Sequence, residues 1–186
     1  MSTVTLHESA SEVASLAARA SLPLGASPLA AATAHVLPPV AAVTPSGGGL
    51  APILVADDDP DDRYFIRRLI TKTGTEHPIR TFEDGSEVVN YLGAIAAGGP
   101  DVRRLAPKLL FLDLKMTGLG GFGFLEWARA QKSALPMTIV VLSNSAEPAD
   151  MAQAMALGAH RYLVKYPSVN TFGTIIRSVY PLPLVK

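Results

Sequence analysis

Acidic, hydroxyl and ammonium side chains follow four short apolar runs of this 186-residue sequence. The polar groups are Asp57, Asp58 and Asp59 after residues 53–56, Asp113 after 109–112, Ser143 after 137–142, and Lys165 after 162–164. A carboxylate can act as a nucleophile and form an aspartyl phosphate. Clustered carboxylates suit Mg²⁺, and an ammonium group is a compact donor to a phosphoryl oxygen. These residue types therefore indicate phosphoryl transfer to a carboxylate.

The apolar runs alternate with segments that have helical periodicity. We predict strands at 53–56, 79–82, 109–113, 137–143 and 162–165, and helices at 60–73, 86–92, 122–131, 148–157 and 169–179. This alternation is typical of a parallel sheet with helices on both faces, and nearly continuous apolar strands are expected there. The predicted fold class is α/β, with a doubly wound five-stranded parallel sheet.

The strand order 2-1-3-4-5 would bring four of these strand ends to one crevice, because doubly wound sheets place their sites at the carboxyl ends of the strands. Asp57, Asp58 and Asp113 would then lie close together, and like charges at short range repel one another. A divalent cation relieves this repulsion, and an all-oxygen, partly hydrated site favours Mg²⁺ as the cofactor. Asp113 is then the predicted nucleophile, with Ser143 and Lys165 as donors to the phosphoryl oxygens.

Four segments, ILVADDDPDD, LLFLDLKMTG, VVLSNS and GAHRYLVK, occur in an order and spacing that resemble the receiver domain of two-component response regulators. The resemblance covers residues 51–180. It implies a flavodoxin-like receiver fold in which Asp113 accepts a phosphoryl group from a sensor histidine kinase or a phosphotransfer protein. The chain would then be a phosphorelay component and an autocatalytic phosphoacceptor, capable of slow autodephosphorylation, rather than an enzyme.

The resemblance also implies roles for individual residues. Asp57, Asp58 and Asp113 would bind Mg²⁺ together with the backbone carbonyl of Lys115. Lys165 would bind the phosphate, and the switch residues would be Ser143, as the hydroxyl, and Tyr162, as the rotating aromatic ring.

A narrower resemblance and two departures concern the loops. The segment GGPDVRRLAPK before residue 109 resembles stand-alone receivers that serve bacterial phytochromes, which suggests a phytochrome-type kinase as the partner. The family usually has Pro directly after the strand-five lysine, whereas here Tyr166 precedes Pro167. The loop after Asp113 contains Gly118, Gly120 and Gly121 where the family usually has Pro and Asp-Gly.

Composition divides the chain near residue 50. Residues 1–50 are rich in Ala, Ser and Pro, and we predict a disordered arm there, followed by the receiver domain at 51–186. The formal net charge of zero argues against nucleic-acid binding. No apolar run reaches the roughly 20 residues of a membrane span. The sequence contains no Cys, which fits a reducing compartment, and we predict a cytoplasmic location.

The output of such a domain would depend on surface contacts, because only PLPLVK follows residue 180. We therefore interpret the chain as a single-domain response regulator. A candidate homodimer surface is formed by the helix 148–157, the strand 162–165 and the helix 169–179.

Three other functions and one simpler interpretation compete with this one. A degenerate receiver would bind partners without phosphorylation. This chain, however, has the full set of residues for phosphorylation: the acid pair Asp57 and Asp58, the acceptor Asp113 and the lysine Lys165. An aspartyl phosphatase needs a second acid two residues after the nucleophile, where this chain has Lys115. A flavodoxin-like cofactor binder needs a glycine-rich phosphate loop after the first strand, where this chain is acidic. The simpler interpretation is that Asp57, Asp58, Asp59, Asp61 and Asp62 merely cap the following helix and favour its dipole.

Overall fold

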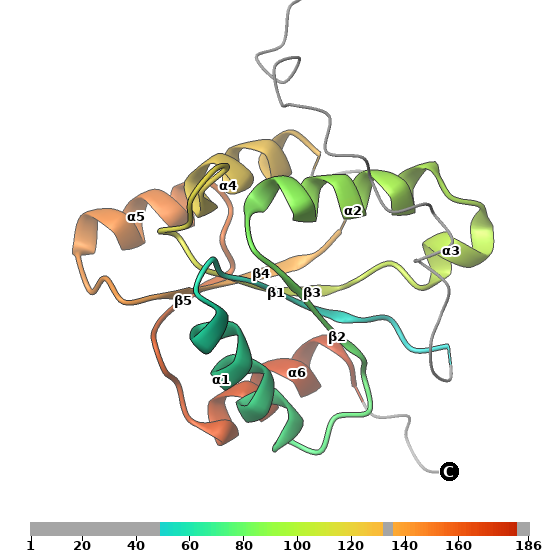
Figure 1. Cartoon of the computed structure of the whole chain (residues 1–186), viewed down its shortest axis with the longest axis horizontal. Helices are drawn as coiled ribbons and strands as arrows, with labels where there is room; N and C mark the ends of the chain where they lie inside the picture. The colour runs from blue at the N-terminus through green and yellow to red at the C-terminus, as the bar shows by residue number, and fades with distance from the viewer. Residues whose placement is uncertain (1–48, 132–135, 182–186) are drawn as a thin grey trace, which may run out of the picture. The chain divides into compact units, whose positions relative to one another are not determined.

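The computed structural model describes residues 49–131 and 136–181. These residues form a five-stranded parallel sheet with helices on both faces, as Figure 1 shows. The predicted arm, residues 1–50, lies almost wholly outside the described residues.

The sheet has the predicted order, β2-β1-β3-β4-β5, and each neighbouring pair of strands is parallel. The strands are β1 (Ile53–Ala56), β2 (Ile79–Phe82), β3 (Leu109–Leu112), β4 (Thr138–Ser143) and β5 (Arg161–Val164). The register pairs Ala56 with Leu112. Asp57 and Asp113 are the next residues of these two strands, so they leave the sheet side by side.

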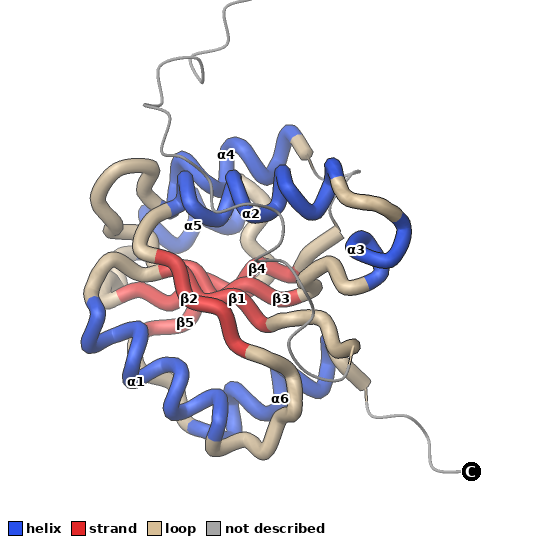
Figure 2. Tube along the Cα trace, turned by 45° about the vertical axis from the view of Figure 1, so that its right-hand side comes forward, coloured by secondary structure: helices blue, strands red, loops and turns tan. Residues whose placement is uncertain are grey.

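Helices cover the two faces of the sheet. They are α1 (Pro60–Thr71), α2 (Gly85–Ala97), α3 (Pro100–Arg104), α4 (Gly121–Ala130), α5 (Pro148–Ala156) and α6 (Val169–Val179). Helices α2, α4 and α5 lie on one face and α1 and α6 on the other, with the sheet between them in Figure 2. None of these helices is long and apolar enough to cross a membrane, among the residues that the structure describes.

The helix predicted at 86–92 is too short, and the stretch from 93 to 108, where no helix was predicted, contains the end of α2 and all of α3. Gly93 does not end the second helix at Leu92. Ile95 is buried and continues the stripe formed by Val88 and Leu92. Residues spaced by three and four lie on one helical face, so burial of this stripe favours the longer helix.

The core has two layers because strand side chains alternate between the faces of the sheet. Leu54 and Leu110 pack with α2 and α4 on one face, while Val55 and Phe111 pack with α1 and α6 on the other. The rings of Phe111 and Phe172 meet edge to face, with centroids 4.9 Å apart. Burying each such side chain contributes about 1.5 to 3 kcal/mol, which fixes the strands whose ends carry the polar residues.

Candidate functional site

Three carboxylates meet at the carboxyl ends of β1 and β3. Asp57 and Asp58 follow β1, Asp113 follows β3, and one oxygen of each lies within 4.8 Å of the others. The backbone N–H of Asp113 donates to the carbonyl of Ala56 at 2.8 Å, which ties the two strand ends together. Asp57 is 1% exposed and Asp113 is 5% exposed. The structure therefore brings together the three acids that the sequence predicted as neighbours.

The loop between β1 and α1 is held by contacts at its two ends. Asp59 caps α1, because its Oδ1 accepts a hydrogen bond from the backbone N–H of Asp61 at 2.8 Å. The guanidinium of Arg63 donates to the carbonyls of Asp57 at 2.8 Å and Asp58 at 3.0 Å. Sequence reasoning missed Arg63, whose guanidinium fixes the backbone that carries the acid pair.

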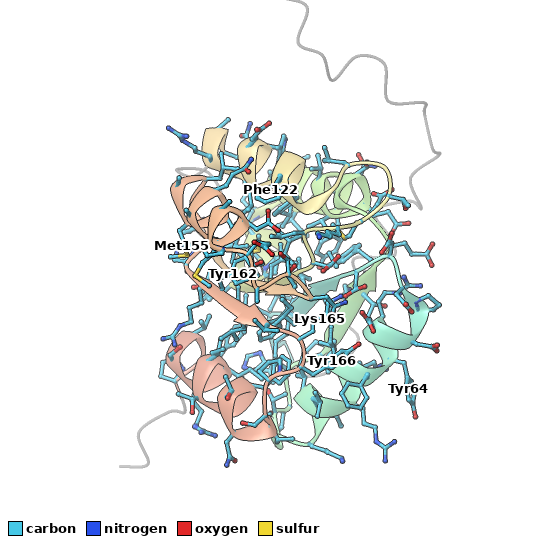
Figure 3. The ribbon with its side chains drawn as sticks, turned by 90° about the vertical axis from the view of Figure 1, so that its left-hand side faces the viewer. Tyr64, Phe122, Met155, Tyr162, Lys165 and Tyr166 are labelled. Atoms are coloured by element: carbon cyan, nitrogen blue, oxygen red, sulfur yellow. The ribbon has the colours of Figure 1, made fainter. Side chains whose placement is uncertain are left out.

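Lys165 joins the acids from the end of β5. Its Nζ lies 2.7 Å from Oδ2 of Asp57, 2.8 Å from Oδ2 of Asp62 and 3.2 Å from Oδ1 of Asp113. Its side chain is only 3% exposed. Figure 3 shows Lys165 beside Tyr166, beyond the end of the strand. The predicted lysine is therefore in place, and it has an additional acidic partner, Asp62, outside the predicted site.

Asp62 is that additional partner, and Tyr166 holds it. The hydroxyl of Tyr166 donates to Oδ1 of Asp62, and the Tyr166 ring meets Phe65 edge to face at 4.9 Å. The peptide bond between Lys165 and Tyr166 is cis. The interpretation of Asp62 as a helix-end acid only is incomplete. A signal was available, because Asp62 lies four residues before the buried Ile66 and so on the inward face of α1.

Burial and charge shift the protonation equilibria of these groups. Burial raises the pKa of Asp57 to about 6, against the opposing effect of Lys165. Burial alone would lower the pKa of Lys165, but hydrogen bonds to Asp57 and Asp62 and the charge of Asp113 raise it. Burial would raise the pKa of Asp62, but Lys165 and Tyr166 hold it below its usual value. The hydrogen bond to Asp62 raises the pKa of Tyr166 to about 12.

The loop between β3 and α4 closes over the acids. The backbone N–H of Lys115 donates to Oδ2 of Asp113, and that of Thr117 donates to Oδ2 of Asp58, both at 2.9 Å. A Cβ at Gly121 would lie 2.2 Å from the carbonyl oxygen of Asp113, so only glycine fits this close approach. The predicted role of the Lys115 carbonyl as a metal ligand stays a prediction.

Ser143 and Tyr162 lie on neighbouring strands and contact the same loop. Ser143 is fully buried at the end of β4, and its Oγ accepts a hydrogen bond from the backbone N–H of Ser145 at 3.2 Å. The hydroxyl of Tyr162 donates to the carbonyl of Ser145 at 2.9 Å. Both predicted switch residues are therefore linked through Ser145, while their switching roles stay predictions.

The acid cluster fits a small divalent cation. Oδ2 of Asp57 is buried, and its polar contact among the described residues is the ion pair with the Lys165 ammonium at 2.7 Å. Octahedral Mg²⁺ holds oxygen ligands at about 2.1 Å, which places those oxygens about 3 to 4.2 Å from one another. Three carboxylate oxygens within 4.8 Å of one another can reach such positions with small side-chain movements.

Fold and site together define a receiver domain. Residues 53–177 match the family model described as the response regulator receiver domain. The chain belongs to this family, which operates in two-component signal transduction.

Two curated relatives show how far the similarity extends. The two-component response regulator ORR1 of rice (Oryza sativa subsp. japonica) is 25% identical over 122 residues, covering 64% of this chain and 51% of the rice protein. The DNA-binding transcriptional regulator NtrC of Salmonella typhimurium is 31% identical over 113 residues, covering 61% of this chain and 21% of NtrC. The chain therefore spans about half the length of the rice regulator, and a smaller part of NtrC.

Solved structures share the fold. The bacteriophytochrome response regulator AtBRR aligns with a TM-score of 0.58 and 24% identity, covering 74% of this chain and 97% of that one. The phosphorylated cyanobacterial phytochrome response regulator RcpA aligns with a TM-score of 0.55 and 22% identity, covering 70% of this chain and 91% of that one. At this level of identity the likeness concerns the fold alone.

Proposed function

We propose that this receiver accepts a phosphoryl group on Asp113 from a histidine kinase or a phosphotransfer protein, with Mg²⁺ bound by the acid pair. The observation that carries the proposal is the placement of Asp113 in one cluster with Asp57 and Asp58, with the buried ammonium of Lys165 3.2 Å from its Oδ1. A turn residue at a strand end would not need this surrounding set of charges. The complete set also favours phosphorylation over the alternative of a degenerate receiver.

The chemistry assigns each step to groups in contact. An oxygen of Asp113 attacks phosphorus, the bond from phosphorus to the donor breaks, and the donor leaves with that electron pair. Lys165 and the backbone N–H of Lys115 hold the two oxygens of Asp113 in fixed directions before attack. Positioning and charge neutralisation provide most of the catalysis in phosphoryl transfer.

The cation would be held by Asp57, Asp58 and Asp113. When bound, Mg²⁺ neutralises negative charge on the phosphoryl oxygens. The Thr117 backbone N–H orients Asp58 by donating to its Oδ2, and Arg63 holds the acid-pair backbone.

Labelling of the purified full chain with acetyl phosphate tests the proposal. With Mg²⁺ present, intact mass is expected to increase by one phosphoryl group, and with EDTA the increase should disappear, because the crowded carboxylates repel an anionic donor. Calcium supplies a control of the same charge with longer ligand distances and should support much less labelling. Equal labelling with Mg²⁺ and EDTA, or none under any condition, would contradict the proposal.

We also propose that phosphorylation is transmitted through Ser143 and Tyr162. The hydroxyl of Ser143 would move toward the phosphoryl oxygens and give up its hydrogen bond from Ser145, whose carbonyl holds Tyr162. A local change of charge would then bias a two-state surface element formed by α5, β5 and α6. The same face exposes Met151, Met155 and Val164, which supports the proposal that it is a homodimer surface.

Substitution of Ser143 by Ala is expected to leave Asp113 able to accept a phosphoryl group but to remove the response near Tyr162. Amide hydrogen exchange, compared with and without acetyl phosphate, measures that response. Ser145→Ala is the matched control, since the hydrogen bond that its Oγ makes within the described part of the chain comes from the backbone N–H of Glu147. Identical phosphorylation-induced changes near Tyr162 in wild type and Ser143→Ala would exclude the switch role of Ser143.

The phosphoryl donor and the cellular location of the protein are also proposals. We propose a phytochrome-type histidine kinase as the phosphoryl donor, on the resemblance of the segment GGPDVRRLAPK to stand-alone phytochrome receivers. We propose a cytoplasmic location, which the absence of Cys supports.

A further inference from the structure

Lys165 has three carboxylate partners, and the proposed phosphoryl transfer uses only two of them. The third is Asp62, whose Oδ2 lies 2.8 Å from Nζ, whereas Oδ1 of Asp113 lies 3.2 Å away. Asp62 comes from the first turn of α1, outside the acid cluster that fits a cation. It therefore contacts the lysine without being one of the candidate metal ligands.

Asp62 is held in place by a second contact. The hydroxyl of Tyr166 donates to Oδ1 of Asp62, which leaves Oδ2 directed at Lys165. The ring of Tyr166 packs edge to face on Phe65, three residues after Asp62 on α1. Figure 3 shows Tyr166 next to Lys165 on the same segment. The carboxylate of Asp62 is thus bound between α1 and the segment that follows β5.

We propose that Asp62 is a positioning residue that restrains the Lys165 ammonium in the resting site and thereby limits how tightly the site holds a phosphoryl group. The proposal rests on the proposed function and adds a regulatory contact to the same site.

The argument begins with the donors of the lysine. An ammonium group has three N–H donors, and three carboxylates surround the one of Lys165. A phosphoryl group on Asp113 brings new acceptor oxygens with about two negative charges. Lys165 can serve them fully only by weakening a contact that it already makes.

When a cation is bound, Asp62 is the main group that competes with the phosphoryl oxygens for the Lys165 ammonium. A cation on Asp57 neutralises that carboxylate, so its attraction for the ammonium falls. Asp62 lies away from the cation cluster and keeps its charge. It also adds negative charge close to the place where an anionic group must bind, so both effects of Asp62 disfavour the phosphoryl group.

Beryllofluoride, a stable phosphoryl analogue, provides the test in the Mg²⁺-loaded full chain. Calorimetry is expected to show about tenfold tighter binding to Asp62→Asn than to wild type, because a contact between charged groups is released. Tyr166→Phe changes no charge and removes only the hydroxyl that holds Asp62, so a smaller gain is expected. Asp62→Glu keeps the charge and should restore affinity close to that of wild type.

Asp61→Asn is the matched charge control. Asp61 is exposed on the same helical turn, and its carboxylate makes no hydrogen bond or ion pair among the described residues. Salt screens an exposed charge over about 8 Å at physiological ionic strength, so the change in affinity should stay below about twofold. Circular dichroism of each variant establishes that it is folded, and Tyr166→Phe provides a readout if Asp62→Asn does not fold.

The outcomes separate the two proposals. Equal gains in Asp62→Asn and Asp61→Asn would show a general charge effect and overturn the positioning role. Unchanged or weaker binding in both Asp62→Asn and Tyr166→Phe would overturn it too. A wild-type chain that binds no beryllofluoride and takes no label on Asp113 would reject the proposed function itself. Both proposals are supported if the wild-type chain binds beryllofluoride, Asp62→Asn binds it about tenfold more tightly and Tyr166→Phe shows a smaller gain.

Discussion

Substitution of Asp113 by Asn is expected to abolish phosphorylation by acetyl phosphate in the presence of Mg²⁺. In the proposed reaction the carboxylate is the nucleophile, and an amide does not form an acyl phosphate, so the labelled fraction should fall to background. The change is nearly isosteric and keeps an oxygen that can accept from the backbone N–H of Lys115. It removes a negative charge 3.2 Å from the Lys165 ammonium, which retains Asp57 and Asp62 as partners. The variant should therefore fold.

Intact mass and peptide mapping after reduction of the phosphoprotein would measure this loss and locate the label. Asp61→Asn is the control, because it makes the same chemical change at an exposed carboxylate nearby and should label like wild type. Full-yield labelling of Asp113→Asn would reject Asp113 as the acceptor. Labelling of Asp61→Asn at background would instead indicate that the loss comes from charge in general.

The sheet and the acid cluster were predictable because their signals are local. Apolar runs of four to six residues mark strands that are buried on both faces. The parallel topology brings the acids that follow these strands to the same edge of the sheet. The order 2-1-3-4-5 then placed Asp57, Asp58 and Asp113 in one cluster without any contact being known. The burial of Ile95, which extends α2, was harder to predict because Gly93 interrupts the helical pattern.

The contacts of Asp62 and Arg63 could not be predicted in the same way. Asp62 meets Lys165 across 103 positions of sequence, and its spacing to Ile66 indicates that it faces inward but not which distant residue it contacts. The aromatic pair of Phe65 and Tyr166 depends on the path of the chain after β5. Arg63 binds carbonyl groups, and backbone carbonyls carry no sequence signal. The residues that form the acid cluster were therefore predictable from their types and positions. The contacts that depend on helix packing, on the path of a loop or on backbone atoms were not.

Substitution of Asp57 by Asn is expected to stabilise the metal-free protein at pH 7.5 and to remove most of its stabilisation by Mg²⁺. Burial raises the pKa of Asp57 from 3.8 to about 6, so between these values the folded state binds more protons than the unfolded state. Stability contributed by this group therefore falls as pH rises through that window, by on the order of 3 kcal/mol. Asn resembles the protonated acid and avoids this loss.

The stability difference between Asp57→Asn and wild type, measured by urea unfolding in EDTA from pH 3.5 to 7.5, isolates this group. The difference should be small at pH 3.5, grow in favour of the variant up to about pH 6, and then level off. The other resolved shifts titrate elsewhere, since the pKa of Asp62 is lowered below 3.8 and that of Lys165 is raised above 10.5. A difference that is constant with pH would contradict the burial argument.

Mg²⁺ should reverse the ranking of the two proteins. A ligand that binds only the folded state stabilises it according to its concentration relative to Kd, so wild type should gain stability as Mg²⁺ is added. Asp57→Asn lacks one of the three carboxylates of the cluster and should gain much less. Asp61→Asn should respond to Mg²⁺ as wild type does, because its carboxylate is exposed and lies outside the cluster. An equal Mg²⁺ response in wild type and Asp57→Asn would place the cation elsewhere. In that case Asp57 would destabilise the metal-free fold without binding the cation.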